Sequence, residues 1–163
     1  YDVWHKQGFL QATPGASISY DFVAQHLRGV FNRYDVQRLA FDRYNMKFLT
    51  PCLVRAGFTP EELERFEPFG QGMVSMSPAL RELETMLLRC ELRHGNHPVL
   101  TMCAGNAVLE TDAAENRKFT KKKATGRIDG MVALAMAVGV ARIGEAADDS
   151  ATFDDFIMNP IGR

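Results

Sequence analysis

The sequence lacks several features that would place it in a common class. Its 163 residues contain no run of 18 apolar residues, so it holds no stretch suited to a membrane span. Its formal charge is −1, with 19 Lys and Arg against 20 Asp and Glu, so nucleic acid would have to bind a local basic patch. Its three cysteines, Cys52, Cys90 and Cys103, form no CxxC pair, which favours reduced thiols over a disulfide framework.

Familiar catalytic and binding motifs are also missing. The sequence contains no GxxxxGK[ST] loop for a nucleotide phosphate and no serine or cysteine in a nucleophile elbow. The series Cys90, His94, His97 and Cys103 has the ligand types of a zinc site, but its spacing matches none of the usual patterns. The chain starts at Tyr1 without a methionine, in the middle of an amphipathic pattern, so we expect it to be part of a longer protein.

The composition is that of a globular domain, with 46% apolar and 24% charged residues. Strands and helices are predicted to alternate, which favours an α/β fold with a largely parallel sheet. Apolar spacing and turn residues predict helices over about 1–7, 19–32, 45–56 and 127–143, a helix of one or two turns that begins at Thr59, and a longer helix that begins at Ser77 and Pro78. Strands are predicted over 36–41 and 66–69, and residues 99–109 pass from helix into strand. Residues 1–143 would form the domain, and residues 144–163 an acidic tail or connector.

Two aspartates lie at positions that often belong to binding or catalytic sites. Asp42 directly follows the predicted strand 36–41, and open α/β sheets bind ligands at the ends of their strands. A cap or turn residue for the next helix is the alternative. Asp129 lies in the first turn of an almost wholly apolar helix, where it could simply complement the helix dipole or could meet a cation.

A basic run precedes Asp129. It comprises Arg117, Lys118, Lys121, Lys122, Lys123 and Arg127. Such a run is commonly a solvated face. Here it leads directly to a candidate acidic site, and cations beside carboxylates suit an enzyme that cleaves phosphodiesters, because the cations can hold the flanking phosphates.

Several phrases taken together resemble one family, the C-terminal nuclease domain of the large terminase subunit of tailed bacteriophages. The resemblance covers residues 1 to about 143 and depends on the order of the phrases. They are Tyr1-x2-Trp4-x3-Gly8-x-Leu10 with Thr13-Pro14-Gly15, Phe41-Asp42-Arg43, Phe69-Gly70-Gln71-Gly72 with Met76-Ser77-Pro78, His97-Pro98-Val99-Leu100, and Gly105-Asn106-Ala107-Val108 followed by Asp112, Asn116, Lys118, Lys121 and Arg127-Ile128-Asp129-Gly130.

The resemblance implies an RNase H-like mixed sheet flanked by helices, incomplete at its N-terminal end. It also implies an endonuclease that cuts concatemeric viral DNA with two Mg²⁺ or Mn²⁺ ions. Asp42 and Asp129 match two of the family's three metal-binding acids, so we expect them to lie close together. The first acid would lie upstream of Tyr1, as would the ATPase that uses ATP. Asp112 is either an auxiliary metal ligand or a turn residue, and Lys118, Lys121, Lys122, Lys123 and Arg127 would contact DNA.

The partners implied are double-stranded viral DNA, the portal protein and the small terminase subunit, with the cytoplasm of a bacterial host as the location. Because the family's first strand would be absent, the edge of strand 36–41 could also support self-association. Two other functions remain open. One is a DNA-gripping or portal-docking module without activity, which the absent acid favours. The other is a different RNase H-like nuclease, of the resolvase or transposase type.

Overall fold

A computed structural model describes residues 1–13, 15, 17–44 and 46–141, so the predicted tail over 144–163 lies outside the described residues. The helices are α1 (Asp2–Lys6), α2 (Tyr20–Arg33), α3 (Met46–Arg55), α4 (Pro60–Leu63), α5 (Met73–Leu88), α6 (Pro98–Asn106) and an unlabelled helix over 129–141. The strands are β1 (Leu39–Phe41), β2 (Phe66–Pro68), β3 (Leu109–Thr111) and β4 (Arg117–Phe119). Among the described helices none has the length and apolar character needed to cross a membrane.

The strands form two small sheets. β1 and β2 are parallel, and β3 and β4 are antiparallel, so the α/β class is confirmed. The expected single, largely parallel sheet is not seen among the described residues, whose strands form two separate pairs. β1 is shorter than the predicted strand 36–41. The reason lies partly at Val36, whose carbonyl accepts a hydrogen bond from the Arg65 guanidinium at 2.8 Å instead of taking part in a ladder.

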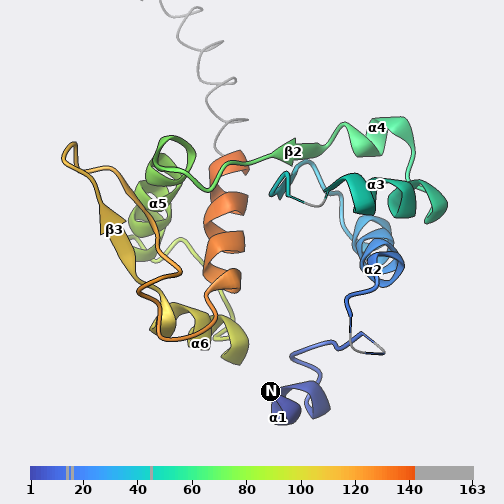
Figure 1. The fold of residues 1–163 in the computed structure, drawn as a ribbon, viewed down its shortest axis with the longest axis horizontal. Helices are drawn as coiled ribbons and strands as arrows, with labels where there is room; N and C mark the ends of the chain where they lie inside the picture. Colours follow the sequence, from blue (N-terminus) through green and yellow to red (C-terminus); the bar gives the residue numbers. More distant parts are fainter. Residues whose placement is uncertain (14, 16, 45, 142–163) are drawn as a thin grey trace, which may run out of the picture.

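The chain packs around two cores, one on each side of the β1–β2 pair (Figure 1). The first core lies between α2, α3 and α4 and consists of Ala24, Cys52, Leu53, Phe58 and Phe66. The second core lies between α5 and the helix over 129–141, which Figure 1 draws in orange, and includes Met76, Leu80, Leu83, Val132 and Met136. β2 connects the two, since Phe66 belongs to the first core and Phe69, just beyond the strand, to the second.

Two predicted helix starts are confirmed by their caps. The Ser19 hydroxyl accepts a hydrogen bond from the Phe22 N–H at 3.3 Å at the start of α2. At α4, the Thr59 hydroxyl accepts from the Glu62 N–H, and the Glu62 carboxylate accepts from the Thr59 N–H, which completes a capping box.

The predicted start of the next helix at Ser77 and Pro78 is wrong. α5 begins at Met73, with Gly72 as its N-cap, and Pro78 lies inside the helix. Ser77 is 1% exposed and belongs to the buried face rather than to a cap. The apolar face of Met76, Ala79, Leu80 and Leu83 extends the helix toward the N-terminus. Pro78 is tolerated because the carbonyl that loses its donor belongs to Val74, which is 91% exposed and open to water.

One further expectation needs correction. The helical pattern predicts that Cys90 faces the core from the end of α5, but the residue follows the helix with a φ of 56° and is exposed. The positive φ turns the chain away after Leu88, so the cysteine leaves the helix face. The polar segment after Asp112 gives no signal of regular structure in the sequence, but it contains β4, which pairs Lys118 with Glu110 across the antiparallel ladder.

One ion pair joins α2 to α4 over the first core. The Arg28 guanidinium donates to both carboxylate oxygens of Glu62, at 2.6 and 2.7 Å, and lies 4.6 Å from the ring centroid of Phe58. This bidentate pair and the Thr59 N–H hold the pKa of Glu62 at about 2, below its ordinary value of 4.5. Glu62 therefore supports both the capping box and the contact between the two helices.

We predict that Glu62→Gln lowers the melting temperature in a pH-dependent way. Because the pKa of Glu62 is lower in the folded protein than in the unfolded chain, its ionised form stabilises the fold above about pH 4.5, and this stabilisation is lost as the pH falls toward 2. The difference in melting temperature between wild type and variant should therefore be largest above pH 4.5 and shrink below it. Glu64→Gln, on the same segment, is the control. A difference that is constant with pH would contradict the prediction.

Candidate functional site

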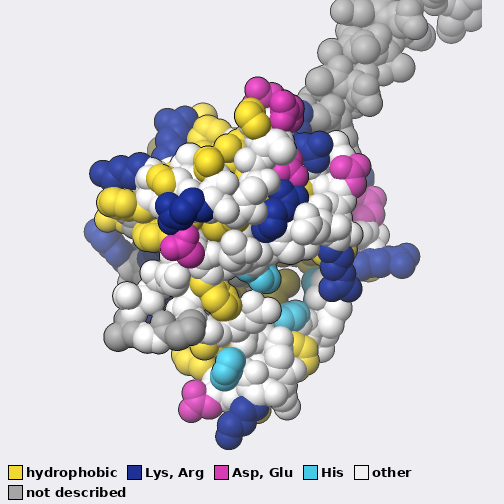
Figure 2. Space-filling model, turned by 90° about the vertical axis from the view of Figure 1, so that its right-hand side faces the viewer, with side chains coloured by type: hydrophobic (Ala, Val, Ile, Leu, Met, Phe, Trp, Pro, Cys, Tyr) yellow, Lys and Arg dark blue, Asp and Glu magenta, His cyan; other side chains and the backbone are white. Residues whose placement is uncertain are grey.

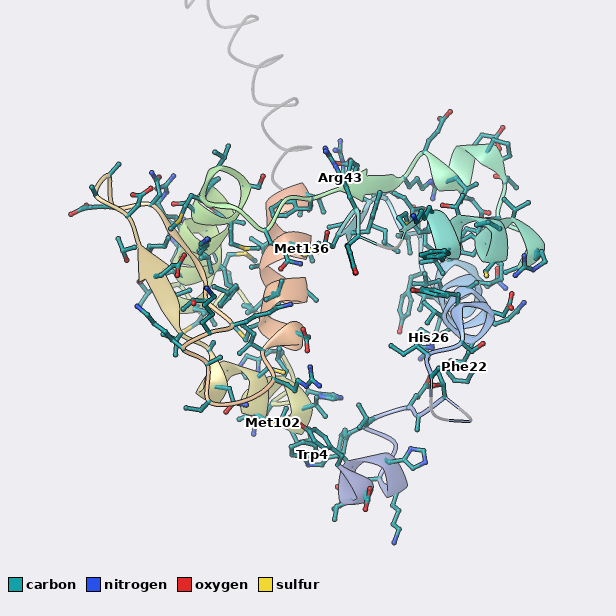
Figure 3. The ribbon with its side chains drawn as sticks, in the orientation of Figure 1. Trp4, Phe22, His26, Arg43, Met102 and Met136 are labelled. Atoms are coloured by element: carbon teal, nitrogen blue, oxygen red, sulfur yellow. The ribbon has the colours of Figure 1, made fainter. Side chains whose placement is uncertain are left out.

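A cavity of about 940 Å³ lies between the β1 segment and the helix over 129–141. Residues 36–42 and Gln71 line it at the end of the β1–β2 pair, Lys121 and Asp129 line it together, and the helix contributes Val132, Ala133, Met136, Ala137, Val140 and Ala141. We call it the two-acid cavity, because Asp42 and Asp129 both line it. Figure 3 shows Met136 on the side of the helix that faces this space, and Arg43, the neighbour of Asp42, near the junction of the two halves.

Asp42 follows β1 directly and has both carboxylate oxygens engaged. Its Oδ1 accepts from the Tyr44 N–H at 3.1 Å, as a turn residue would, and its Oδ2 accepts from the Gln71 side-chain amide at 2.7 Å. The turn interpretation therefore describes the Oδ1 contact of Asp42, and its role in a site stays a prediction. The turn contact orients a carboxylate that also lines the cavity.

The register of the sheet explains why Gln71 reaches Asp42. Phe41 lies opposite Pro68 in the parallel pair, and the Phe69 N–H donates to the Phe41 carbonyl at 2.8 Å. Parallel strands end at the same edge of a sheet, so the residues that follow β1 and β2 emerge side by side. Asp42 and Gln71 are among those residues.

Asp129 opens the helix over 129–141 and is exposed. The Lys121 ammonium lies 3.8 Å from its Oδ1, and both side chains are about two-thirds exposed. An ion pair this open to water contributes little to stability. Its significance is its location, because Lys121 brings a positive charge to the wall of a cavity that also holds two carboxylates.

The other five cations of the basic run differ in whether they have a carboxylate partner. Arg117 pairs with Glu84 at 2.7 Å, and Lys118 pairs with Glu110 at 2.9 Å, so with Lys121 three of the six cations have carboxylate partners. Lys122, Lys123 and Arg127 are exposed. Figure 2 shows the opposite side, formed largely by α2 to α4, where Lys and Arg are scattered among acidic and apolar side chains.

Asp112 lies in the turn between β3 and β4 and does not line the two-acid cavity. Its Oδ1 accepts from the N–H groups of Ala114 and Asn116, each at 2.9 Å, and its Oδ2 accepts from the Asn116 amide at 3.1 Å. These bonds, with that of the Asn116 N–H the strongest, lower the pKa of Asp112. This arrangement favours the turn interpretation over that of an auxiliary metal ligand.

The donors in the two-acid cavity are oxygen atoms, which are the ligands that Mg²⁺ and Mn²⁺ prefer. Asp42 and Asp129 supply carboxylates, and Gln71 adds a side-chain amide. Within the part of the chain that the structure describes, no group of three or more His, Cys, Asp or Glu side chains is arranged to hold a metal ion. Asp42 and Asp129 are ligands of the type that a hard divalent cation prefers, but two carboxylates are fewer than such an ion usually binds.

Gln71 is a site residue that the sequence patterns do not single out. The segment Gly70-Gln71-Gly72 suggests at most a phosphate loop, for which it is too short. The feature of the sequence that could have identified Gln71 is its position after the predicted strand 66–69, which places it at the same sheet edge as Asp42.

A family model described as the endonuclease domain of the terminase large subunit matches residues 1–145. The chain belongs to this family. Over 161 residues it is 47% identical to the terminase large subunit of Enterobacteria phage HK97, covering 99% of this chain and 31% of that protein. Protein YmfN of Escherichia coli (strain K12) is 28% identical over 150 residues, which are 91% of this chain and 32% of YmfN.

The crystal structure of the HK97 bacteriophage large terminase has the same fold over the matched part. Its TM-score is 0.78 at 46% identity, over 85% of this chain and 28% of the solved chain. This chain therefore spans about a third of the length of the relatives that it matches. The resemblance read from the sequence is confirmed at the level of the family.

Gly139 fixes the distance between the helix that begins at Asp129 and the loop that holds Gln71. A Cβ on Gly139 would lie 2.6 Å from Cε2 and 2.7 Å from Cζ of the buried Phe69 ring, and 3.1 Å from the Ala79 Cβ. The helix can approach the β2–α5 loop this closely only because no side chain intervenes. Phe69 is itself hydrogen-bonded to the end of β1.

We predict that Gly139→Ala destabilises the protein by about 1–3 kcal/mol, the usual cost of overpacking a core. Gly29→Ala is the matched control, because Gly29 lies inside α2 and a Cβ added there would have nothing within 4 Å. The control should raise stability by up to about 1 kcal/mol through helix propensity. Urea unfolding of both variants measures the difference. Equal effects at the two positions would show that Phe69 does not restrain the helix.

Proposed function

We propose that this chain is the metal-dependent endonuclease domain of a viral DNA-packaging terminase, with an RNase H-like fold, and that it cuts concatemeric double-stranded DNA. The observation that supports the proposal best is that Asp42 and Asp129 line the same cavity, one at the end of a strand and the other at the start of a helix. Family membership supports the nuclease class, and the two acids supply the chemistry that the class requires.

Asp42 and Asp129 would hold Mg²⁺ or Mn²⁺. When bound, a pair of such ions supplies positive charge that stabilises the negative charge developing on the phosphodiester oxygens. Asp42 and Asp129 would determine where the positive charge of the ions is placed. Asp42 is oriented by the Tyr44 N–H and by Gln71, and Asp129 stands at a helix start, where the helix dipole also favours negative charge.

The basic run would hold the DNA. Lys121 lies at the cavity wall, and Lys122, Lys123 and Arg127 are exposed close to it in the chain. Lysine contacts with phosphates give affinity without reading the base sequence, which suits cutting with little sequence preference. Lys118 would contribute only if it exchanged Glu110 for a phosphate.

A segment upstream of Tyr1 would complete the site. Among the described residues β1 pairs with β2 alone, and the apolar side chains of the helix over 129–141 face the same cavity, so a further strand could pair with β1 and cover that helix. The greater length of the relatives leaves room for it. We propose that this strand supplies the third acid and that an ATPase that uses ATP precedes it.

The remaining assignments follow from membership of the family. We propose the portal protein and the small terminase subunit as partners, and the cytoplasm of a bacterial host as the location. Self-association through residues 36–41 would occur only where the upstream strand is absent. The alternative, a DNA-gripping or portal-docking module without activity, draws its support from the count of two acids at the cavity.

We predict that a form of the protein extended upstream through the proposed strand nicks plasmid DNA in Mn²⁺, and that Asp42→Asn or Asp129→Asn abolishes nicking. Residues 1–163 alone should cut weakly or not at all, because two carboxylates do not readily hold two ions. Asp112→Asn is the matched carboxylate control and should keep most of the activity, since Asp112 contacts only its own turn. Strong cutting by residues 1–163 would contradict the proposal of an upstream acid. Unchanged nicking by Asp129→Asn would contradict the assigned site.

We also predict that replacing Lys121, Lys122 and Lys123 by Ala weakens DNA binding evenly across sequences. The salt dependence of binding should fall by up to about three phosphate contacts. The double variant Lys122→Ala/Lys123→Ala tests the run without touching the ion pair to Asp129. Lys6→Ala/Lys47→Ala, on α1 and α3, is the control. An unchanged salt slope in the triple variant would show that the run is only a solvated face.

A further inference from the structure

Gln71 is the side chain that joins Asp42 to the rest of the molecule. An ionised carboxylate can only accept hydrogen bonds, so the Gln71 Nε2–H group donates to Asp42 Oδ2, at 2.7 Å. The other oxygen, Oδ1, accepts from the Tyr44 backbone two residues further on. That contact is local to the turn. Gln71 is therefore the contact that ties the Asp42 carboxylate to a second element of the fold.

The position of Gln71 is fixed from both ends of its loop. Before it, the Phe69 N–H donates to the Phe41 carbonyl, and the Phe69 ring is buried against Gly139. After it, Gly72 is the N-cap of α5, and its carbonyl accepts from the Met76 N–H at 2.9 Å. Because only two residues separate the anchored Phe69 from this cap, the backbone of the loop has little freedom. The backbone of Gln71 is therefore held in a fixed position beside Asp42.

A second glutamine in the same cavity offers a comparison. Gln37 also lines the two-acid cavity, but its amide is placed 3.5 Å from the Asp35 carbonyl and contacts neither acid. It is exposed, whereas Gln71 is half-buried. The two residues share type and cavity and differ in the contact to Asp42.

We propose that Gln71 is a positioning residue for Asp42, holding the carboxylate in the orientation in which it binds the catalytic metal. The inference rests on the proposed function, because it treats Asp42 as a metal ligand. Hydrogen-bond partners of metal ligands orient them, and losing such a partner commonly weakens metal affinity by about 10–100-fold. Gln71 acts through Asp42 and need not touch the DNA.

The test compares Gln71→Met with Gln37→Met in the full-length protein. Methionine keeps the length of the side chain and removes the donor. We expect Gln71→Met to weaken Mn²⁺ binding, measured by calorimetry without DNA, about tenfold or more. The Mn²⁺ concentration for half-maximal nicking should rise in step, while the maximal rate at saturating Mn²⁺ changes less. Gln37→Met should bind Mn²⁺ as the wild type does.

A third variant tests whether the hydrogen-bond donor at position 71, rather than the shape of the side chain, determines Mn²⁺ affinity. In Gln71→His the ring Nε2–H can reach a similar point, so Mn²⁺ affinity should recover most of the loss. A folded His variant that bound Mn²⁺ as weakly as the Met variant would overturn the donor role. Circular dichroism and melting temperature establish that each variant is folded.

Asp42→Asn distinguishes the positioning role from the proposed function. If Asp42→Asn weakens Mn²⁺ binding and Gln71→Met does not, the positioning role is wrong and the proposed site stands. If neither variant changes Mn²⁺ binding, or the wild type binds no Mn²⁺, Asp42 is not a metal ligand and both proposals fail. Weakened binding in both variants, with Gln37→Met unchanged, supports both.

Discussion

The parallel pairing of β1 with β2 is the constraint on which the rest of this structure depends. The pair is only three residues long, yet it separates two hydrophobic cores and contributes to each, through Phe66 on one side and through Phe69, just beyond the strand, on the other. The bond from the Phe69 N–H to the Phe41 carbonyl ends the ladder and sets where both strands leave the sheet. A shift of one residue would move Gln71 away from Asp42 and turn Phe69 away from Gly139.

The candidate site is built by two different kinds of restraint. Asp42 is placed by backbone pairing and by hydrogen bonds to both of its oxygens. Asp129 is placed by packing, because its helix is fixed through buried side chains and the close approach at Gly139, while its carboxylate remains exposed beside Lys121. A site of this type keeps one acid oriented and leaves the other free to exchange a lysine for a cation.

Sequence patterns predicted the features that depend on local chemistry. Ser19 and Thr59 cap helices because a hydroxyl there meets a free N–H within three residues, whatever the tertiary fold. Ser77 and Pro78 show the same signal and fail, because burial of Met76 and Leu80 extends α5 past them. The positions of Asp42 at a strand end and of Asp129 at a helix start were also predicted, while their role as metal ligands comes from the family resemblance and stays a prediction. The contact of Gln71 with Asp42 was not predicted, since it depends on the register between two strands, and a single sequence does not reveal that register.

The distribution of polar and apolar groups around the two-acid cavity is the physical basis for the proposed upstream strand. One wall is a helix face on which Val132, Met136 and Val140 are at most 6% exposed and the alanines at 133, 137 and 141 are exposed, and the other is a strand that pairs along one edge only within the described chain. Water can hydrogen-bond to the strand edge, but it is a poor partner for the apolar side chains of the helix face. A strand with alternating side chains satisfies both at once, with its backbone on β1 and its apolar side on the helix. The proposed upstream strand would end beside Asp42, where a further carboxylate would complete a metal site, so one element would serve both stability and metal binding.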